Sequence, residues 1–347
     1  MKILILKPSS LGDVVQALPV LRLLKRHRPE ALIFWWIDAG LAPLLEHDPD
    51  LAGVVRFERQ RWASPRHWPE MWRSLRWLRA QRFDWVIDLQ SLARSGVFAW
   101  LAQGDLVVGL DESREGARGF YDVAVPRASF HTHAVDWYLA VLQRLGVPVH
   151  WNFTWLPERL EVAAAVRTKW PQAQDDTRWI ALQPGARWPN KRWPIEHFAE
   201  TARQLAAQLP KVRCVVLGGE DDKPLGDFLA STLRERGLNL TGQTSLPETV
   251  EWLRRSDLLI TNDTGPMHIA AALGKPLVAL FGPTEPRRTG PYGRLDDVMQ
   301  HLLPCAPCLK PRCAWPQPIE CLTAITPAQV VQRALAAFAA CHAGRPA

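Results

Sequence analysis

The sequence predicts an α/β protein of two domains, each built on a parallel sheet with helices on both faces. Short apolar runs, typical of buried strands, alternate with amphipathic helical patterns. The alternation stops between residues 149 and 171 and then resumes, and 347 residues are enough for two domains. We place an N-terminal domain at 1–160, a C-terminal domain at 161–325, and a helix and tail at 326–347 that could pack back toward the first domain.

In the first domain, the run "MKILILK" predicts a strand that leads through a short loop into a mostly apolar helix. This helix should end before Pro29, because proline disfavours helical backbone in the residue before it. The further apolar runs expected to be strands lie at 31–39, 83–90 and 105–111. Strands separated by helices in this way must run parallel in the sheet.

In the second domain, the same pattern predicts strands at 178–186, 212–222, 257–262 and 275–286. Helices are expected at 194–209, 246–256, 266–274 and 326–342, with Thr326 as a helix N-cap. Residues 149–171 read as a connection between the domains. Ligands of such sheets bind at the carboxyl ends of the strands, so two facing domains place the site in the cleft between them.

The composition fits a soluble globular protein, with 47% apolar and 22% charged residues. A net charge of +7 fits an acidic partner, but no basic run or aromatic platform typical of nucleic-acid binding occurs, so we expect no nucleic acid. No segment has the roughly 18 uncharged apolar residues of a membrane span, and the N-terminus reads as a strand rather than a signal peptide. These features predict a cytoplasmic location.

Three strand ends in the second domain carry groups that favour anions. The residues are Gly185 followed by Lys191, Gly218 followed by Glu220, and the turn Asp263, Thr264 and Gly265 followed by His268. Glycine lets backbone approach a ligand, and free N–H groups at a helix start attract phosphate. Each pattern alone also fits a capped helix, an ordinary turn or a surface cation. Together they suggest a nucleoside diphosphate site, although no G-x-G-x-x-G or P-loop motif is present.

The first loop, "KPSSLGDVV", places one carboxylate, Asp13, between a strand and a helix. That is where an α/β protein presents an active group. A carboxylate at this position also caps a helix by accepting backbone N–H bonds. The residues of the loop leave both roles open.

Four segments together resemble the lipopolysaccharide heptosyltransferases, glycosyltransferase family 9: "KPSSLGDVVQALP", "DLQSLARS", "PNKRWP" and "NDTGPMHIAAALGKPLVALFGPTEP". The resemblance spans almost the whole chain. It implies the GT-B fold of two Rossmann-like domains, an N-terminal domain for the lipopolysaccharide acceptor and a C-terminal domain for ADP-heptose. It also implies sugar transfer with inversion, without a cofactor or metal, ADP-heptose being a co-substrate.

The resemblance implies a role for each matching residue. Asp13 is the general base, and Ser9, Ser10 and Gly12 line its loop near the acceptor. Lys191 and the turn 263–265 with His268 hold the diphosphate, with Gly185, Gly218 and Glu220 nearby. Asp263 either holds a sugar hydroxyl or orders the turn. The acceptor, Kdo-lipid A, is acidic, and the best cationic matches for it are Arg61, Arg114 and His133.

The acceptor lies in a membrane, so the resemblance implies peripheral contact at the cytoplasmic face of the inner membrane. In the helical pattern at 68–80, one face should be core and the rest solvated; the residues of the core face are Trp68, Met71, Trp72, Leu75 and Leu78. Arg73, Arg76 and Trp77 point away from it, and arginine with tryptophan on an exposed face also suits a lipid surface.

Four cysteines lie together at positions 305, 308, 313 and 321. Four thiols can hold a tetrahedral zinc ion, but the paired spacing of common zinc sites is missing. Our prediction is therefore reduced thiols in a proline-rich loop and no metal, with zinc as the alternative.

The leading hypothesis is transfer of heptose to the Kdo-lipid A inner core, with the first heptose slightly favoured over the second. "SREGARGFY" and "HAVDWY" look more like the first-heptose enzymes, and the cysteine cluster looks more like the second. The alternatives are a related nucleotide-sugar transferase with another sugar or acceptor, and a non-catalytic nucleotide or glycan-binding module. Retention of the Asp13 carboxylate disfavours the module.

Overall fold

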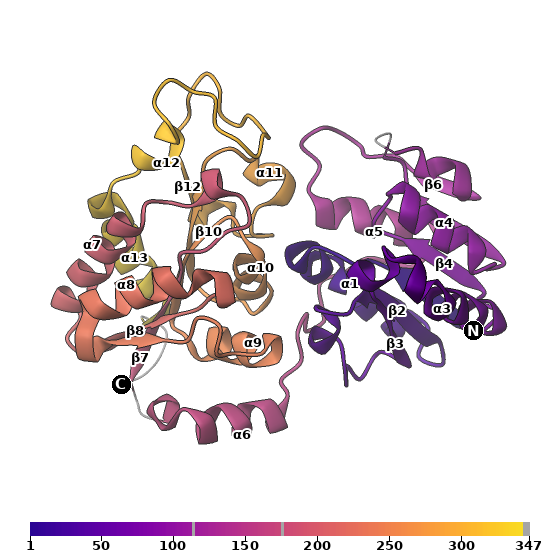
Figure 1. Ribbon diagram of the computed structural model, residues 1–347, viewed down its shortest axis with the longest axis horizontal. Helices are drawn as coiled ribbons and strands as arrows, with labels where there is room; N and C mark the ends of the chain where they lie inside the picture. The colour runs from indigo at the N-terminus through magenta and orange to yellow at the C-terminus, as the bar shows by residue number, and fades with distance from the viewer. Residues whose placement is uncertain (113–114, 175–176, 343–347) are drawn as a thin grey trace. The chain divides into compact units, whose positions relative to one another are not determined.

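The computed structural model describes residues 1–112, 115–174 and 177–342. The chain folds into two compact units, unit 1 at Met1–Pro157 and unit 2 at Glu158–Ala347 (Figure 1). The sequence-based division sets its boundary three residues further along, at 160. Each unit contains one six-stranded parallel sheet with helices packed around it.

Unit 1 has the strand order β3-β2-β1-β4-β5-β6, the order of Rossmann-type sheets. Its strands are β1 Lys2–Leu6, β2 Leu32–Asp38, β3 Gly53–Phe57, β4 Trp85–Asp88, β5 Leu106–Leu110 and β6 Val123–Val125. Its α-helices are α1 Leu11–His27, α2 Arg59–Trp62, α3 Trp68–Ala80, α4 Ala93–Leu101 and α5 Ala134–Arg144. The four predicted strands are confirmed as β1, β2, β4 and β5. The two that were missed, β3 and β6, are the edge strands, whose residues are mostly only half-buried.

The strand order of unit 1 reverses beside β1, so the chain leaves β1 and β4 toward opposite sides of the sheet. Leu6, at the end of β1, pairs with Trp36 of β2 on one side and with Asp88 of β4 on the other. The loops that follow β1 and β4 therefore separate at the carboxyl edge and leave room for polar groups between them.

The core of unit 1 is rich in aromatic rings. Trp36 lies 4.4 Å from Phe57 and 4.8 Å from Phe98 between ring centroids, and Trp62 stacks on Phe98 at 6.0 Å. Such offset and edge contacts add to the free energy gained by burying the rings. The residues meet because β2, β3, α2 and α4 all place rings on the same face of the sheet.

The prediction for α3 is partly wrong. Leu75 and Leu78 are buried as expected, but Trp68 is 48% and Trp72 54% exposed. The helical period correctly puts these residues on neighbouring sides of α3. The helical period does not show how much of that face the sheet and the adjacent helices cover. Here they leave Trp68 and Trp72 uncovered.

Unit 2 repeats the topology of unit 1, with the order β12-β11-β10-β7-β8-β9. Its strands are β7 Arg178–Gln183, β8 Val212–Val216, β9 Gly237–Asn239, β10 Leu258–Asn262, β11 Leu277–Phe281 and β12 Val298–Gln300. Its α-helices are α6 Leu160–Lys169, α7 Ile195–Gln208, α8 Lys223–Leu233, α9 Leu246–Arg255, α10 Gly265–Ala272, α11 Pro286–Thr289, α12 Glu320–Thr323 and α13 Pro327–His342. Counted from β7, the order again reverses beside the first strand, between β7 and β10.

The segment expected to be a plain connection contains a helix, α6, and this expectation is wrong. α6 packs against α9, yet only Ala163 and Val166 of it are fully buried. Its apolar face is narrow and made of small residues, so the helical period is weak. Tertiary packing against α9 holds this helix, which local pattern alone did not reveal.

The last helix, α13, is confirmed with Thr326 at its start. Thr326 and Gln329 exchange hydrogen bonds in the manner of a capping box. α13 packs on α7, β10 and β11, and its Val330, Val331 and Ala334 belong to the core of unit 2. The residues that the sequence-based division sets apart at 326–342 thus share that core. None of the helices in the described ranges is long and apolar enough to span a bilayer.

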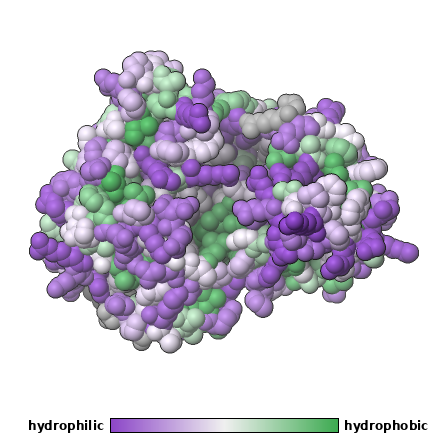
Figure 2. Space-filling view, in the orientation of Figure 1, coloured by the Kyte–Doolittle hydropathy of each residue, from purple (hydrophilic) through white to green (hydrophobic). Residues whose placement is uncertain are grey.

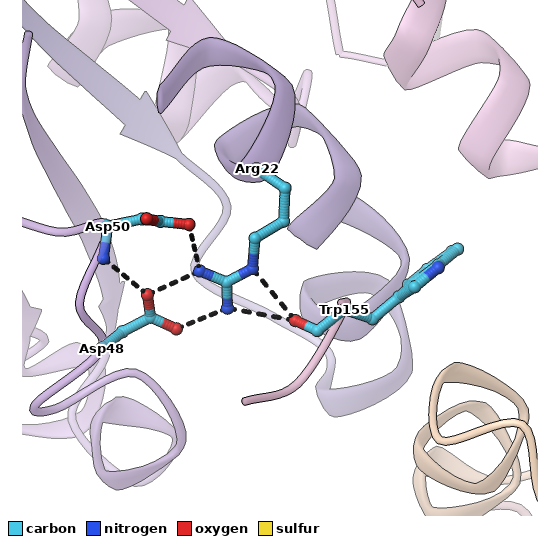
Figure 3. Close-up of polar contacts among 4 residues, drawn as sticks. All are labelled: Arg22, Asp48, Asp50 and Trp155. Atoms are coloured by element: carbon cyan, nitrogen blue, oxygen red, sulfur yellow. Dashed lines mark hydrogen bonds and ion pairs between the residues drawn. The ribbon is translucent and has the colours of Figure 1, made fainter. Parts of the chain in front are cut away.

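A buried ion pair holds the far end of α1 to the rest of unit 1 (Figure 3). Both terminal nitrogens of Arg22 lie 2.6 Å from the two oxygens of Asp48, and Asp50 lies 2.7 Å away. The guanidinium also donates to the carbonyl oxygen of Trp155 at 3.0 and 3.1 Å. Arg22 thereby joins α1 to the loop before β3 and to the last segment of unit 1. It also borders an open pocket of about 720 Å³.

We expect Arg22→Met to destabilise unit 1 by about 3–5 kcal/mol, because it leaves the buried Asp48 without its cation. Urea unfolding followed by circular dichroism measures this loss. The control Arg28→Ala removes an exposed arginine from the end of the same helix and should change stability by less than about 0.5 kcal/mol. Equal stability of Arg22→Met and the parent protein would contradict the role given to this ion pair.

Candidate functional site

The loop after β1 holds Asp13 at the start of α1. Asp13 is the third residue of the helix, and its Oδ2 accepts hydrogen bonds from the backbone N–H of Ser10 at 2.9 Å and from the Ser10 hydroxyl at 2.6 Å. This arrangement is a capping box, so Asp13 does cap α1, which is one of the two roles that the sequence left open. The same bonds fix the carboxylate in the loop that follows β1, at the carboxyl edge of the sheet, and Gly12 of this loop is buried.

Lys7 supplies a buried cation beneath this loop, and the sequence analysis did not single it out. Its side chain is only 4% exposed, its Nζ donates to the carbonyl of Leu89 at 3.0 Å, and it lies 5.0 Å from the centre of the Tyr138 ring. Burial acts to lower the pKa of Lys7, but Tyr138, Asp13 and Asp88 outweigh burial and raise that pKa. Lys7 therefore stays charged close to Asp13.

Asp88, at the end of β4, is the second group that the sequence analysis missed. It accepts from the backbone of Gln90 at 2.8 Å and of Ser91 at 3.2 Å, and from the Tyr121 hydroxyl at 2.7 Å. Burial raises the pKa of Asp88, while these hydrogen bonds oppose the rise. Tyr121 reaches Asp88 across Gly109, where a Cβ atom would lie 2.3 Å from the ring.

In unit 2, Lys191 and Asp263 form an ion pair at the place where the strand order reverses. The Nζ of Lys191 lies 2.6 Å from Oδ2 of Asp263, and the Thr284 hydroxyl donates to the same oxygen at 2.6 Å. Both side chains of the pair are largely buried, and Lys191 also lies 4.8 Å from the centre of the Trp188 ring. Asp263 thus positions Lys191, which keeps two further N–H groups for a ligand.

The turn that carries Lys191, Pro189–Lys191, is held from three directions. The Asn262 side chain accepts from the backbone of Trp193 at 3.0 Å and donates to the carbonyl of Pro184 at 2.7 Å. The Trp193 indole donates to the carbonyl of Ile325 at 3.0 Å. The Asn190 side chain donates to the carbonyl of Lys310 at 2.8 Å. The position of Lys191 is therefore fixed by contacts with distant parts of the chain.

The predicted anion-binding turn opens α10 as expected. Thr264 is the N-cap, Gly265 the first helical residue, and Pro266 lies in the first turn, where its missing N–H leaves no bond unmade. His268 is 8% exposed on the same short helix. The free N–H groups and the dipole of α10 therefore favour an anion next to the Lys191–Asp263 pair.

The other two predicted strand ends lie beside this turn, because β8, β7 and β10 are neighbours in the sheet. Gly185 and Gly218 both face Asp222, and a Cβ atom on Gly185 would lie 2.2 Å from an Asp222 oxygen. Asp222 itself accepts from the backbone N–H of Gly219 at 3.0 Å. Because Gly185 and Gly218 have no side chain, the Asp222 carboxylate, which the sequence analysis missed, fits against them. The exposed Glu220 pairs with Lys223 instead.

The residues expected to meet the acceptor have separate places in unit 1. Arg61 is exposed and pairs with Glu70 at 2.9 Å. His133 is buried at the N-cap of α5, where its Nδ1 accepts from the backbone N–H of Val135 at 3.2 Å. Arg114 lies outside the described residues. These positions leave the acceptor assignments as predictions.

The four clustered cysteines surround one small cavity of about 20 Å³ that Asn190 and Trp315 also line. All four are free thiols. In the described ranges, no group of three or more His, Cys, Asp or Glu residues has an arrangement that could hold a metal ion. Burial and the neighbouring cysteines raise the pKa of Cys321 to about 11. The cluster lies directly beneath the turn that carries Lys191.

Comparison with known sequences gives a consistent result. The family described as glycosyltransferase family 9 (heptosyltransferase) matches residues 71–317. The lipopolysaccharide heptosyltransferase 1 of Pseudomonas aeruginosa is 32% identical, over 92% of this chain and 89% of that protein. The lipopolysaccharide heptosyltransferase 2 of Escherichia coli is 29% identical, over 86% of this chain and 88% of that protein.

Solved structures agree with the fold. The ADP-heptose lipopolysaccharide heptosyltransferase II of E. coli superposes with a TM-score of 0.78 at 25% identity, over 98% of this chain and 99% of that one. A family 9 glycosyltransferase from Veillonella parvula gives a TM-score of 0.82 at 25% identity, over 98% and 97%. The predicted GT-B class, with two Rossmann-like units, is thereby confirmed.

The cysteine cluster gives a prediction that needs no substrate. At pH 8, iodoacetamide should modify the exposed Cys313 more than about tenfold faster than Cys321, because a thiol with a raised pKa is rarely a thiolate. Cys214, which burial gives a pKa of about 12, should also react slowly and serves as an internal reference. Peptide mass spectrometry over time measures the three rates. Equal rates for Cys313 and Cys321 would show that the cavity is open to reagent.

Proposed function

Because the chain belongs to glycosyltransferase family 9, the heptosyltransferases, we propose that it transfers heptose from ADP-heptose to the Kdo-lipid A inner core of lipopolysaccharide. The observation that carries the proposal is the Lys191–Asp263 ion pair at the N-terminus of α10. That arrangement suits the charge of a nucleoside diphosphate leaving group. The names of the relatives point to ADP-heptose as donor and to lipopolysaccharide as the class of acceptor, and Kdo-lipid A is the acceptor that we propose within that class.

In this mechanism Asp13 acts as the general base. It takes the proton from the acceptor hydroxyl while the hydroxyl oxygen bonds to the anomeric carbon of the heptose. The bond from that carbon to the phosphate oxygen breaks, and attack from the opposite face inverts the configuration. Ser10 holds the carboxylate in place, and the buried Lys7 places a positive charge near it.

Lys191 and the first turn of α10 stabilise the departing ADP. Negative charge develops on the diphosphate as the glycosidic bond breaks, and donors already in position lower the energy of that state. Asp263 accepts a hydrogen bond from one N–H of the Lys191 ammonium group. The other two N–H groups remain as donors for the diphosphate. Gly185, Gly218 and His268 border the same region and are proposed to contact the donor. Lys191 and the first turn of α10 supply the positive charge that a metal ion would otherwise provide, so we propose that no cofactor is needed.

The acceptor is assigned to unit 1, with Ser9, Gly12, Arg61, Arg114 and His133 as contacts. We propose the first heptose as the product, and the once-heptosylated lipid as the competing acceptor. Because the acceptor is a membrane lipid, the enzyme would work at the cytoplasmic face of the inner membrane. A different nucleotide sugar in the same site is the second candidate, since family 9 membership fixes the fold more tightly than the sugar.

Replacing the base gives the first test. Asp13→Asn should lower kcat with Kdo-lipid A and ADP-heptose by about 10²–10⁴-fold, since an amide cannot accept the proton. ADP release measures the rate. The control Asp105→Asn changes an exposed carboxylate just before the amino end of β5, at the edge of the sheet opposite to Asp13, and should leave the rate unchanged. Unaltered turnover in Asp13→Asn would leave Asp13 only its capping role.

Removing the cation gives the second test. Lys191→Met should weaken ADP binding by about 10-fold or more and lower kcat further, because one charge-assisted contact to phosphate is lost. Calorimetry with ADP alone and ADP release with both substrates separate the two effects. The control Lys211→Met removes an exposed lysine at the amino end of β8. ADP affinity equal to that of the parent protein would place the diphosphate elsewhere.

The two acceptors separate the finer alternatives. Turnover of Kdo-lipid A, with none for its once-heptosylated form, supports the first-heptose assignment. The reverse result assigns the second heptose. Binding of ADP without turnover of either acceptor would favour another sugar or acceptor within the same fold.

A further inference from the structure

One side of unit 1 combines exposed tryptophans with an excess of arginines. We call it the arginine–tryptophan face: the exposed arginines of residues 59–82 together with Trp68, Trp72 and Trp100. These residues belong to α2, α3 and α4, to the turns between α2 and α3, and to the turn after α3. In Figure 2 the side of unit 1 that carries α3, at the right, is mostly hydrophilic.

The charge of this face is one-sided. Residues 59–82 contain seven arginines, all exposed, and a single acidic residue, Glu70. Glu70 pairs with Arg61 at 2.9 Å and with His67 at 3.2 Å, which leaves the arginines further along α3 without a carboxylate in this stretch. Since the whole chain has a net charge of +7, most of its excess positive charge falls within this short segment.

The tryptophans lie along one flank of α3. Trp68, Trp72 and Arg76 follow each other at intervals of four residues and so share a side of the helix. Arg79 extends this flank and donates to the side chain of Gln103 at 2.8 and 3.1 Å. Gln103 comes just after the end of α4, which carries Trp100. The three tryptophans are 48%, 54% and 58% exposed, although neighbouring side chains of the same helices are buried.

A bilayer with anionic headgroups matches this combination of groups. Tryptophan rings prefer the boundary between headgroups and acyl chains, and arginines attract anionic lipid while their stems lie against apolar surface. Packing inside the protein does not explain the rings, because they are half exposed. Nucleic acid would match the charge, but the rings lie along a helix flank rather than on a sheet or groove that could stack successive bases.

We propose that the arginine–tryptophan face docks on an anionic phospholipid bilayer, with α3 lying along the headgroup layer. The inference builds on the proposed function, whose acceptor is a membrane lipid, and adds the surface that meets the bilayer. The binding energy comes from the arginines and the three rings, so it needs neither ADP-heptose nor Kdo-lipid A. Docking therefore does not depend on recognition of the acceptor.

The test is vesicle co-sedimentation of the full chain without either substrate. The vesicles contain equal parts phosphatidylglycerol and phosphatidylcholine, or phosphatidylcholine alone. One variant joins Trp68→Ser with Trp72→Ser, and a second joins Arg73→Gln with Arg76→Gln. The matched control joins Trp151→Ser with Arg28→Gln, which removes an equally exposed ring and an exposed arginine from other parts of unit 1. Arg61 is left intact because it is assigned to the acceptor.

The parent protein and the control should bind the anionic vesicles and not the neutral ones. The double arginine variant should bind more than about tenfold more weakly, since each arginine near such a surface contributes about fivefold. The double tryptophan variant should also bind more weakly, because it loses two rings that favour the boundary between headgroups and acyl chains. Added salt should release the parent protein. Thermal unfolding equal to that of the parent protein shows that the variants remain folded, and unchanged turnover of detergent-dispersed acceptor shows that the substrate site is intact.

Any of the following results would overturn the proposal: equal binding by the test variants and the parent protein, an equal loss in the control, or tighter binding of a single-stranded RNA than of the vesicles at the same salt concentration. A requirement for lipid A in the vesicles would also overturn it and assign the face to the acceptor site. The co-sedimentation assay contains no sugar donor, so a failure of heptose transfer would not change its result. A failure of the docking proposal can therefore be told apart from a failure of the proposed function.

Discussion

The reversal of strand order beside the first strand of each sheet determines where this protein can hold polar groups. Parallel strands require crossovers, and crossovers to opposite faces separate the loops at one edge. In unit 1 that edge receives Lys7, Asp13 and Asp88, and in unit 2 it receives Lys191 and Asp263. Away from these edges the inner strands are buried on both faces and carry mostly apolar side chains, while the outermost strands of each sheet are half-buried. The strand order therefore determines which edge of each sheet can carry polar groups, whatever the side chains are.

Each of these edges keeps a buried ammonium group next to carboxylates. An isolated buried charge is costly, and a paired one is retained when hydrogen bonds complete its surroundings. Asp263 and Thr284 serve Lys191 in this way, which accounts for a carboxylate beside a proposed phosphate site. The sequence analysis left Asp263 between a sugar contact and an ordering role, and the observed contacts support the ordering role. A lysine held by one of its three N–H groups remains a donor.

The apolar runs were enough to predict the inner strands, the starts of α7, α9, α10 and α13, and the three adjacent strand ends of unit 2. The edge strands were missed because a half-buried strand has no continuous apolar run. Thr284 was missed for a different reason: it acts on Asp263, far away in the sequence, and nothing near Thr284 marks that partner. Asp222 was missed because only the fold brings Gly185 against it. Trp68 and Trp72 show the limit of periodicity, which gives the side of a helix but not the reach of its neighbours. Lys7 and Asp88 could have been found, since each is a charged residue at the carboxyl end of a buried strand.

The hydrogen bond from Asn190 to Lys310 ends on a backbone carbonyl rather than on a side chain. This hydrogen bond therefore depends on where the backbone of residue 310 lies and not on its side chain. A deletion in the cysteine-rich loop would move that carbonyl away from Asn190 and loosen the turn that carries Lys191. The length of a loop with no charged group at the site thus helps to set the position of the lysine.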